Sequence, residues 1–307
     1  MKNQGRFLVI TAGALWGFTG LFVRRLSELG LAPMEIAFIR MIVAVTVIGV
    51  YLLAGRRRDL IAVKRKDLPF FIGTGIVSLM LFNYFYFNSI TYSTVAIAVC
   101  LLYTAPAFVV LLSAILFRER ITPRKAVALA VIFGGCICAS GVFGGEQALS
   151  PRGFLFGIGS GFCFGMFSIF SRVLLDRGYA AMTVAFFALA VGAVGTAFFV
   201  DVPAVIAAAA TPEVLLYGVG LGVCCSFLPY LLYPTGLRHL ETGEAAMLVT
   251  SEPLVAAVVS VVLLGEPLTF SVAAGIFLII AGIVIINRAG KKRGPALSEI
   301  SEESENR

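Results

Sequence analysis

Charged side chains are scarce in this sequence: only 13% of its 307 residues are Asp, Glu, Lys or Arg, against about 25% in a typical soluble domain. Hydrophobic residues make up 59% of the chain, and the mean hydropathy is +0.98. This leaves too little polar surface to cover a globule in water. The apolar runs are repeated and about 20 residues long, enough to cross a hydrocarbon core about 30 Å thick. The sequence therefore predicts an all-α integral membrane protein.

Several kinds of functional motif are also missing. The single histidine, His239, excludes a histidine-rich metal site, and the chain has no paired CxxC motifs. No GxxxxGK[ST] phosphate loop and no GxGxxG fingerprint occur. The cysteines all lie inside apolar segments, where they form no secreted disulfide framework: Cys100, Cys136, Cys138, Cys163, Cys224 and Cys225. We therefore expect no metal, no cofactor and no ATP-driven pump.

Ten segments are predicted to cross the membrane as helices. They are residues 7–23, 33–54, 69–88, 94–117, 126–143, 153–171, 179–200, 214–236, 244–264 and 270–287. If the N-terminus is cytoplasmic, 20 of the 24 basic residues fall in cytoplasmic segments and only Arg24, Arg25 and Arg152 fall outside. We expect a multi-pass protein of the inner (plasma) membrane with both termini in the cytoplasm. The basic surplus thus reflects topology, and no nucleic-acid partner is expected.

The chain contains an internal repeat. A shift of 148 aligns the first two spans with the sixth and seventh, and a shift of 147 aligns the remainder. Identical pairs include Gly13/Gly161, Gly17/Gly165, Arg24/Arg172, Gly30/Gly178, Gly73/Gly220, Tyr86/Tyr233, Pro106/Pro253 and Glu119/Glu266. This predicts a duplicated five-helix unit over 1–147 and 148–287, followed by a disordered cytosolic tail over 288–307. Because five is odd, the second copy crosses in the opposite sense, as in the inverted repeats of secondary transporters.

Several local motifs are similar to those of a known family. They are the pair Trp16-Gly17, the intramembrane Arg40, and the runs LLYTAPAFV (101–109), RERIT (118–122) and GEPLT (265–269). With ten spans in two inverted fives, the chain resembles the EamA group of the drug/metabolite transporter superfamily over roughly residues 7–287. The resemblance implies transport of amino acids, amines, nucleoside-like metabolites or toxic organic cations, mostly outward. No motif selects among these substrates.

Two charged residues lie deep inside predicted spans. Arg40 is ~10 Å from one boundary and Glu252 ~12 Å from the other, at 1.5 Å per helical residue. Intramembrane charge marks substrate and ion pathways. Arg40 is a candidate for binding an anionic group of a substrate or for pairing with Glu252; a structural arginine bonded to carbonyls, or one snorkelling outward, is the alternative. Glu252 is a candidate for substrate binding and for proton coupling; a permanently paired structural carboxylate is the alternative.

Polar and aromatic residues near these charges complete the predicted substrate site. They are Trp16, Asn83, Tyr84, Asn88, Tyr103 and Tyr230. Tyr84 and Asn88 are four residues apart and therefore share a helix face. Three further tyrosines near span ends are expected in an interface belt or in core packing: Tyr86, Tyr92 and Tyr233.

Prolines and glycines indicate how the helices pack. Pro106 and Pro253 occupy equivalent positions in the fourth and ninth spans and are predicted to break their helices, which makes them gating candidates; ordinary kinking for packing is the alternative. Small residues four apart allow helices to approach closely: Gly13 and Gly17, and Gly153, Gly157, Gly161 and Gly165.

The leading hypothesis is an exporter of small organic metabolites that works by alternating access, driven by the solute gradient or by proton exchange through Glu252. An importer of the same architecture is left open. A membrane-embedded enzyme would need a reactive group with a partner, and the single histidine and the lone deep carboxylate argue against one. A scaffold would leave Arg40 and Glu252 without a role. The expected partners are the lipid bilayer and a small-molecule substrate; a monomer and a homodimer both remain open.

Overall fold

The computed structural model describes residues 2–55, 58–93, 95–139, 150–263 and 269–288, and within these ranges the chain is helical without strands. The predicted tail beyond Arg288 and most of the GEPLT run lie outside the described residues. In chain order the α-helices are α1 (Lys2–Gly17), α2 (Thr19–Glu28), α3 (Pro33–Ala54), α4 (Leu68–Ile72), α5 (Phe82–Tyr92), α6 (Val95–Leu102), α7 (Ala105–Phe117), α8 (Pro123–Ala139), α9 (Pro151–Asp176), α10 (Ala181–Ala197), α11 (Val202–Ala209), α12 (Pro212–Gly222), α13 (Leu228–Leu237), α14 (Thr242–Leu248), α15 (Ser251–Leu263) and α16 (Phe270–Arg288). Two 3-10 turns, η1 (Arg58–Ile61) and η2 (Arg65–Asp67), and two π-helical segments, η3 (Gly73–Leu81) and η5 (Val223–Phe227), connect them.

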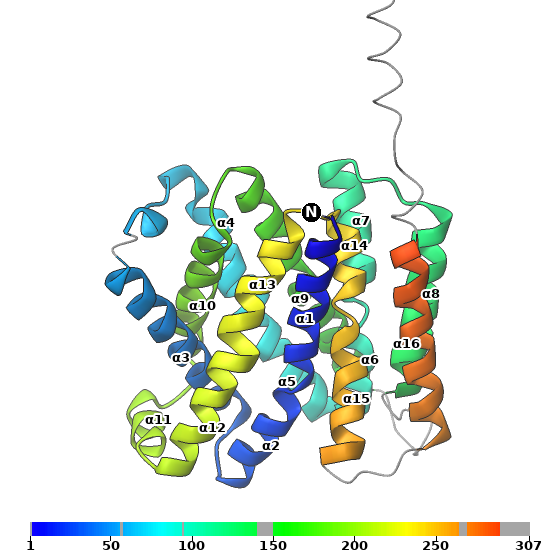
Figure 1. Ribbon diagram of the computed structural model, residues 1–307. Helices are drawn as coiled ribbons and strands as arrows, with labels where there is room; N and C mark the ends of the chain where they lie inside the picture. The colour runs from blue at the N-terminus through cyan, green and yellow to red at the C-terminus, as the bar shows by residue number, and fades with distance from the viewer. Residues whose placement is uncertain (1, 56–57, 94, 140–149, 264–268, 289–307) are drawn as a thin grey trace, which may run out of the picture.

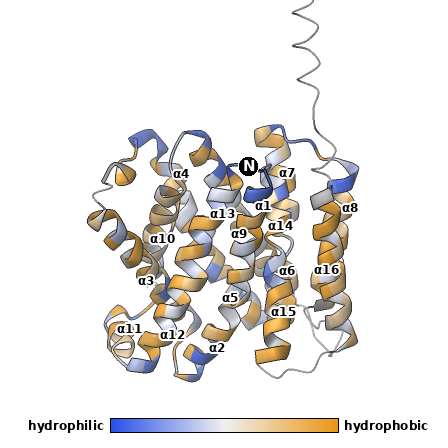
Figure 2. Cartoon of the chain, viewed as in Figure 1, coloured by the Kyte–Doolittle hydropathy of each residue, from blue (hydrophilic) through white to orange (hydrophobic). Residues whose placement is uncertain are grey.

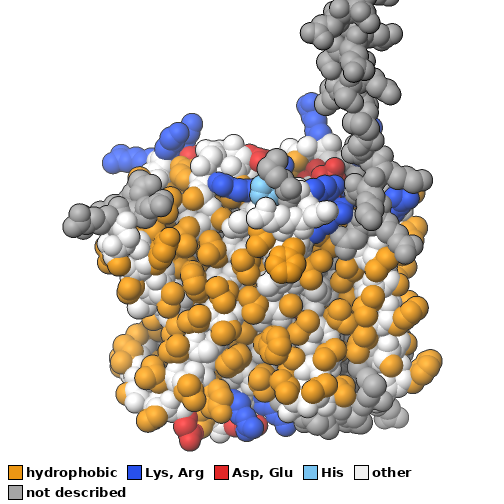
Figure 3. All heavy atoms as spheres, in the orientation of Figure 1, with side chains coloured by type: hydrophobic (Ala, Val, Ile, Leu, Met, Phe, Trp, Pro, Cys, Tyr) orange, Lys and Arg blue, Asp and Glu red, His pale blue; other side chains and the backbone are white. Residues whose placement is uncertain are grey.

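The helices form a bundle (Figure 1), and most of their residues are hydrophobic (Figure 2). Large hydrophobic side chains face outward along its sides, among them Leu155 (70% exposed), Phe198 (85%) and Phe270 (90%). Figure 3 shows this hydrophobic band between two ends, with most of the Lys and Arg side chains at the end where the N-terminus lies. In water such a surface would be unfavourable, but in hydrocarbon it needs no polar partner. The chain is a multi-pass membrane protein.

Seven helical stretches of the described residues are long and apolar enough to cross a membrane. An eighth is added if α10 and α11, which are bent by 115° relative to each other, count as one broken span. The predicted span 33–54 coincides with α3. The first helical stretch is longer than the predicted 7–23, because α1 and α2 together cover 2–28. Two of the ten predicted spans, 126–143 and 270–287, correspond to α8 and α16, which are not among the seven. Length and composition thus support seven or eight spans.

The two parts of the chain repeat the same irregularities. The break between α6 and α7 recurs 146 residues later between α14 and α15, and π-helical η3 overlaps η5 at an offset of 147. Gly30 and Gly178, 148 residues apart, both follow a long helix with a positive φ, +91° and +88°. Side chains rarely adopt this backbone conformation, so glycine is required at both turns. The backbone carries the internal repeat that the residues predict.

The first helix of each part packs against the other part. Helix α1 lies against α13 and α15, whereas α9 lies against α5, α6 and α7. The two helices run in opposite directions, because the beginning of α1 and the end of α9 meet the same segment. A Cβ at Gly5 would lie 2.9 Å from the Gly236 carbonyl oxygen, and Arg172 donates to the Leu240 carbonyl oxygen over 2.9 Å. The two parts are therefore interlocked rather than separate.

Glycines permit these crossings at equivalent positions. A Cβ at Gly13 would lie 2.6 Å from the Val249 carbonyl oxygen, at the α14–α15 break. A Cβ at Gly161 would lie 2.9 Å from the Leu101 carbonyl oxygen, at the α6–α7 break. Both distances are too short for a side-chain carbon. The spacing of small residues thus brings α1 and α9 close to the two helix breaks.

The end of the bundle where α1 begins is held by ion pairs, and we call it the charged end. Arg6 pairs with the buried Glu244 over 2.7 Å, and Lys2 contacts the same carboxylate at 3.1 Å. Glu119 accepts hydrogen bonds from the first backbone N–H groups of α14, Thr242 at 2.5 Å and Gly243 at 3.1 Å. A carboxylate at a helix N-terminus satisfies orphan donors and complements the helix dipole. These contacts join α1, α7 and α14.

A second group of polar contacts lies beside it. Asp67, 1% exposed, pairs with Arg177 and accepts a hydrogen bond from the Tyr179 hydroxyl over 2.6 Å. Burial and the neighbouring Asp67 carboxylate raise the pKa of Tyr179. The tyrosine is therefore a stable donor at neutral pH. These bonds tie the start of α4 to the turn between α9 and α10.

Candidate functional site

A cavity of about 600 Å³ lies inside the bundle. Residues from both parts of the chain line it, and its lining reaches the exposed Gly20 and Pro33, which puts its mouth beside α2 and the start of α3. We call this the mouth end. Of the residues predicted from the sequence, seven line the cavity: Trp16, Arg40, Asn83, Tyr103, Tyr230, Glu252 and Pro253. The volume falls in the range of about 300–1,000 Å³ that is typical of small-molecule sites.

Arg40 brings a buried positive charge to the cavity wall. It lies in α3 and is 9% exposed. Its Nη2 donates a long hydrogen bond, 3.4 Å, to the Asn83 side-chain oxygen, and the Asn83 amide nitrogen donates in turn to the Leu79 carbonyl oxygen over 2.8 Å. The Nε of Arg40 is buried and has no hydrogen-bond partner among the described residues. The guanidinium is thus oriented by a neutral amide and keeps free donor capacity.

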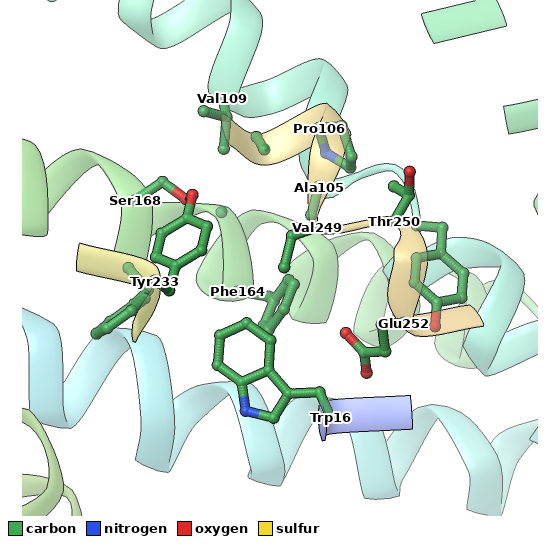
Figure 4. Close-up of a pocket in the computed structure, with 14 residues that line it drawn as sticks. Trp16, Ala105, Pro106, Val109, Phe164, Ser168, Tyr233, Val249, Thr250 and Glu252 are labelled. Atoms are coloured by element: carbon green, nitrogen blue, oxygen red, sulfur yellow. The ribbon is translucent and has the colours of Figure 1, made fainter. Parts of the chain in front are cut away.

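Glu252 brings the opposite charge from the other part of the chain. It lies in the first turn of α15, just after the α14–α15 break, and its backbone N–H donates to the Val249 carbonyl oxygen over 3.0 Å. Figure 4 shows its carboxylate directed toward the indole of Trp16. Within the described part of the chain it forms no ion pair within 4.0 Å, so Arg40 and Glu252 face one cavity without pairing directly.

Aromatic rings form the wall near Glu252. The Trp16 ring lies 5.3 Å from that of Tyr230 and 6.1 Å from that of Phe164. Phe82 lies 5.4 Å from Phe164 and extends this wall toward α5. Edge-to-face contacts at such separations hold the rings in fixed orientations. The cavity therefore has an aromatic, apolar wall beside Glu252.

Two predicted site residues lie elsewhere. Tyr84 and Asn88 share a helix face as expected, since the Asn88 amide donates to the Tyr84 carbonyl oxygen over 2.8 Å. That face is not part of the cavity lining. The ring of Tyr84 packs instead against Phe156 and Phe199, at 6.3 Å and 5.7 Å. The structure thus places Tyr84 in packing between α5, α9 and the end of α10, and Asn88 bonds the backbone of its own helix.

The two predicted gating prolines follow the two helix breaks. Pro106 is the second residue of α7 and Pro253 the third of α15, so each lies in a first turn, where a proline is tolerated. A second, small cavity of about 20 Å³ lies between the breaks and is lined by Pro106, Thr250 and Glu252, among others (Figure 4). This is about the volume that one water molecule needs. The helix breaks of both parts of the chain therefore meet close to Glu252.

Sequence reasoning missed several cavity residues. Tyr86, expected in an interface belt or in core packing, lines the cavity, as do Phe82 and Phe164. Phe164 stands 148 residues after Trp16, so the repeat offset was a signal that could have found it. Tyr233 is 1% exposed and its hydroxyl lies 2.6 Å from the Ser168 hydroxyl, in agreement with the expected core packing. Tyr92, near a helix end, is 41% exposed.

Comparison with known proteins agrees with this architecture. An uncharacterized transporter of Archaeoglobus fulgidus is 28% identical over 275 residues, which is 89% of this chain and 95% of that protein. The uncharacterized transporter YxxF of Bacillus subtilis is 24% identical, with 94% and 92% coverage. A protein known from its crystal structure has the same fold, with a TM-score of 0.77 at 20% identity over 93% of this chain and 96% of that one.

The match to a protein family covers both parts of the chain. The model of the EamA-like transporter family matches twice, over residues 3–141 and 151–288. These ranges include both helix breaks and every residue of the cavity wall discussed above. A transporter role, rather than an enzymatic one, follows from the family and from the relatives that are named transporters. The chain belongs to the EamA-like transporter family.

Proposed function

We propose that this protein is a secondary transporter that exports small organic metabolites, such as amino acids, amines or related compounds, by alternating access. The observation that carries the proposal is the cavity of about 600 Å³, which residues of both parts of the chain line and which contains Arg40 and Glu252. Secondary transporters built from two related halves expose a site of this kind to each side in turn. Export is the direction that the family resemblance implies.

The proposal includes ten spans in two inverted five-helix repeats, residues 1–147 and 148–287. Support comes from the two family-model matches and from the opposite directions of α1 and α9. It also comes from α8 and α16, which pack against each other at one edge of the bundle, where the fifth and tenth spans would lie (Figure 1). Each copy would then contribute one broken helix to the centre, α6–α7 and α14–α15.

The charged end is proposed to face the cytoplasm of an inner (plasma) membrane, with both termini on that side. The excess of Lys and Arg at this end supports the orientation (Figure 3). The cavity mouth beside Gly20 and Pro33 would then open outward. The Arg6–Glu244 pair would close the cytoplasmic side in this state. Export requires a second state in which the charged end opens.

Glu252 is proposed to couple transport to protons. It is a carboxylate within the cavity wall and has no ion pair in the described part of the chain, so it is accessible both to a substrate and to a proton. A carboxylate that alternates between these two partners can exchange one for the other across the membrane.

The test begins with a ligand. Thermal stabilisation of the purified protein is measured with amino acids, amines, quaternary ammonium compounds, nucleosides and sugar phosphates. A ligand at a hundred times its Kd adds about 2.7 kcal/mol of stability. The bound compound is then radiolabelled, and its counterflow is measured in proteoliposomes with and without a pH gradient.

Two variants separate the parts of this proposal. Glu252→Gln, at normal folding, is expected to lose the response to the pH gradient, whereas Arg25→Gln, at the exposed mouth end, keeps it. Undiminished gradient-driven transport in Glu252→Gln would refute proton coupling. Absence of counterflow for every compound that binds would refute the transporter itself.

A further inference from the structure

We propose that the substrate is dipolar: its anionic group binds Arg40 and its cationic group binds Glu252, so that one molecule bridges the two halves of the chain. This inference rests on the proposed function and narrows its substrate class. It follows from the distribution of charge around the cavity, from the free donor of Arg40, and from the apolar wall beside Glu252.

The cavity holds one charge of each sign, and each comes from a different half. Arg40 lies in α3 of the first half, and the equivalent position in the second half is Ala188. Glu252 lies in α15 of the second half, and the equivalent position in the first is Ala105. The two charged groups are therefore not repeated between the halves, although the backbone around them is. A ligand with two opposite charges complements it, whereas a ligand with a single charge leaves one group uncompensated.

Arg40 is prepared for an anionic partner. Among the described residues, its one hydrogen-bond acceptor is the Asn83 amide oxygen, at 3.4 Å, and its Nε has no acceptor. An uncompensated buried charge is costly, and a guanidinium can donate two parallel hydrogen bonds to one carboxylate. Asn83 orients the arginine without neutralising it. The geometry therefore favours a planar anionic group such as a carboxylate.

Glu252 and the aromatic wall provide the other half of the recognition. The carboxylate is directed toward Trp16, whose ring packs on Tyr230 and Phe164 (Figure 4). An ammonium group would meet the carboxylate and the face of an aromatic ring together, and both attract a cation. The apolar part of the ligand would lie against the rings. An organic cation alone would leave Arg40 unpaired, and a sugar phosphate would add negative charge beside Glu252.

Bridging by the ligand also relates binding to conformational change. A ligand shifts an equilibrium between two states only through its different affinity for them. A molecule that contacts both charged groups binds more tightly when the two halves approach each other, and it therefore favours that state. The amine or the acid alone would contact one half.

The experiment uses matched probes on the full-length protein in detergent. The probes are L-leucine, L-valine, L-methionine and L-phenylalanine, each with the amine that lacks its carboxylate and the acid that lacks its amino group. Kd is measured from ligand-dependent thermal stabilisation. At least one amino acid is expected to bind at least tenfold more tightly than both of its analogues. The proposal is overturned if an amine or an acid binds as tightly as its parent amino acid, or if none of the four amino acids binds.

Charge-neutral variants assign the two ends of the ligand. In Arg40→Gln, we expect the amino acid to bind no more tightly than its amine, but still more tightly than its acid. In Glu252→Gln, we expect the amino acid to bind no more tightly than its acid, but still more tightly than its amine. Arg24→Gln, on the exposed face of α2, leaves all three affinities unchanged. Equal losses for all three probes in both variants would contradict the assignment. If only an amine binds and shows counterflow, the dipolar substrate is refuted and the transporter function is supported. If an amino acid binds but shows no counterflow, the transporter function is refuted and dipolar recognition is supported.

Discussion

The two halves of the chain share a backbone plan and differ in the chemistry placed on it. Both contain a π-helical segment, a broken helix followed by a proline, and a glycine turn with positive φ, at offsets of 146 to 148 residues. The aromatic pair Trp16 and Phe164 is also equivalent. The charges are not, because Arg40 and Glu252 both have alanine as their counterpart. The two halves thus share these backbone features, while the two charged groups in the cavity wall are each present in one half alone.

The same contrast separates the two ends of the bundle. At the charged end, Arg6 of α1 pairs with Glu244 of α14. The equivalent positions at the other end, in α9 and α6, are Phe154 and Ile97. One end is therefore held by a buried ion pair and the other has apolar residues at the corresponding places. Removing one partner of a buried ion pair is strongly destabilising, because it leaves an uncompensated buried charge. Three predictions test these differences.

The largest effect is expected at the charged end. Glu244→Gln leaves the buried Arg6 without its carboxylate, and breaking a buried pair in this way costs about 3–5 kcal/mol. We expect a clear fall in Tm of the purified protein. Glu28→Gln is the control, because Glu28 pairs with Arg25 at the exposed mouth end and such pairs contribute about 0–1 kcal/mol. Equal shifts in Tm for both variants would contradict the assigned difference between the ends.

An intermediate effect is expected where the halves interlock. Gly13→Ala and Gly161→Ala place a Cβ against a backbone carbonyl at the two helix breaks, and overpacking of this kind costs about 1–3 kcal/mol. The two variants should lose similar stability, since their contacts are equivalent. Gly49→Ala has open space around it and should match or exceed the wild-type Tm. A loss in only one of the two tight positions would show that the crossings are not equivalent.

The smallest effect is expected at the equivalent tyrosines. Tyr233→Phe removes the hydroxyl that contacts Ser168 at 2.6 Å in the core, a loss of about 1 kcal/mol. Tyr86→Phe alters the cavity wall, so its stability should change less and its ligand affinity more. Tm and ligand Kd are measured together for both variants. Equal changes in Tm and in Kd for the two variants would contradict a core role for Tyr233 and a cavity role for Tyr86.

The cavity residues could be predicted only in part. Arg40 and Glu252 were recognisable because a charge within an apolar run is costly unless it faces water or a partner. Tyr84 and Asn88 lie outside the cavity lining, because the cavity is lined by the adjacent face of α5, which carries Phe82, Asn83 and Tyr86. Nine residues of π-helix precede α5 and change the residues per turn. The orientation of the helix face beyond η3 therefore does not follow from a period of 3.6.

The class of the molecule, its internal repeat, the bounds of α3 and the two prolines that follow helix breaks could all be read from the residues alone. These follow from local quantities: hydropathy, the positions of proline and glycine, and repeated spacing. Long-range packing, in contrast, sets which helix faces line the cavity, the hydrogen bond of Arg40 to Asn83 rather than to Glu252, and the contact of Arg6 with Glu244, 238 residues away. Such contacts depend on how α1 and α9 cross the opposite half, and no pattern within a single helix contains that information.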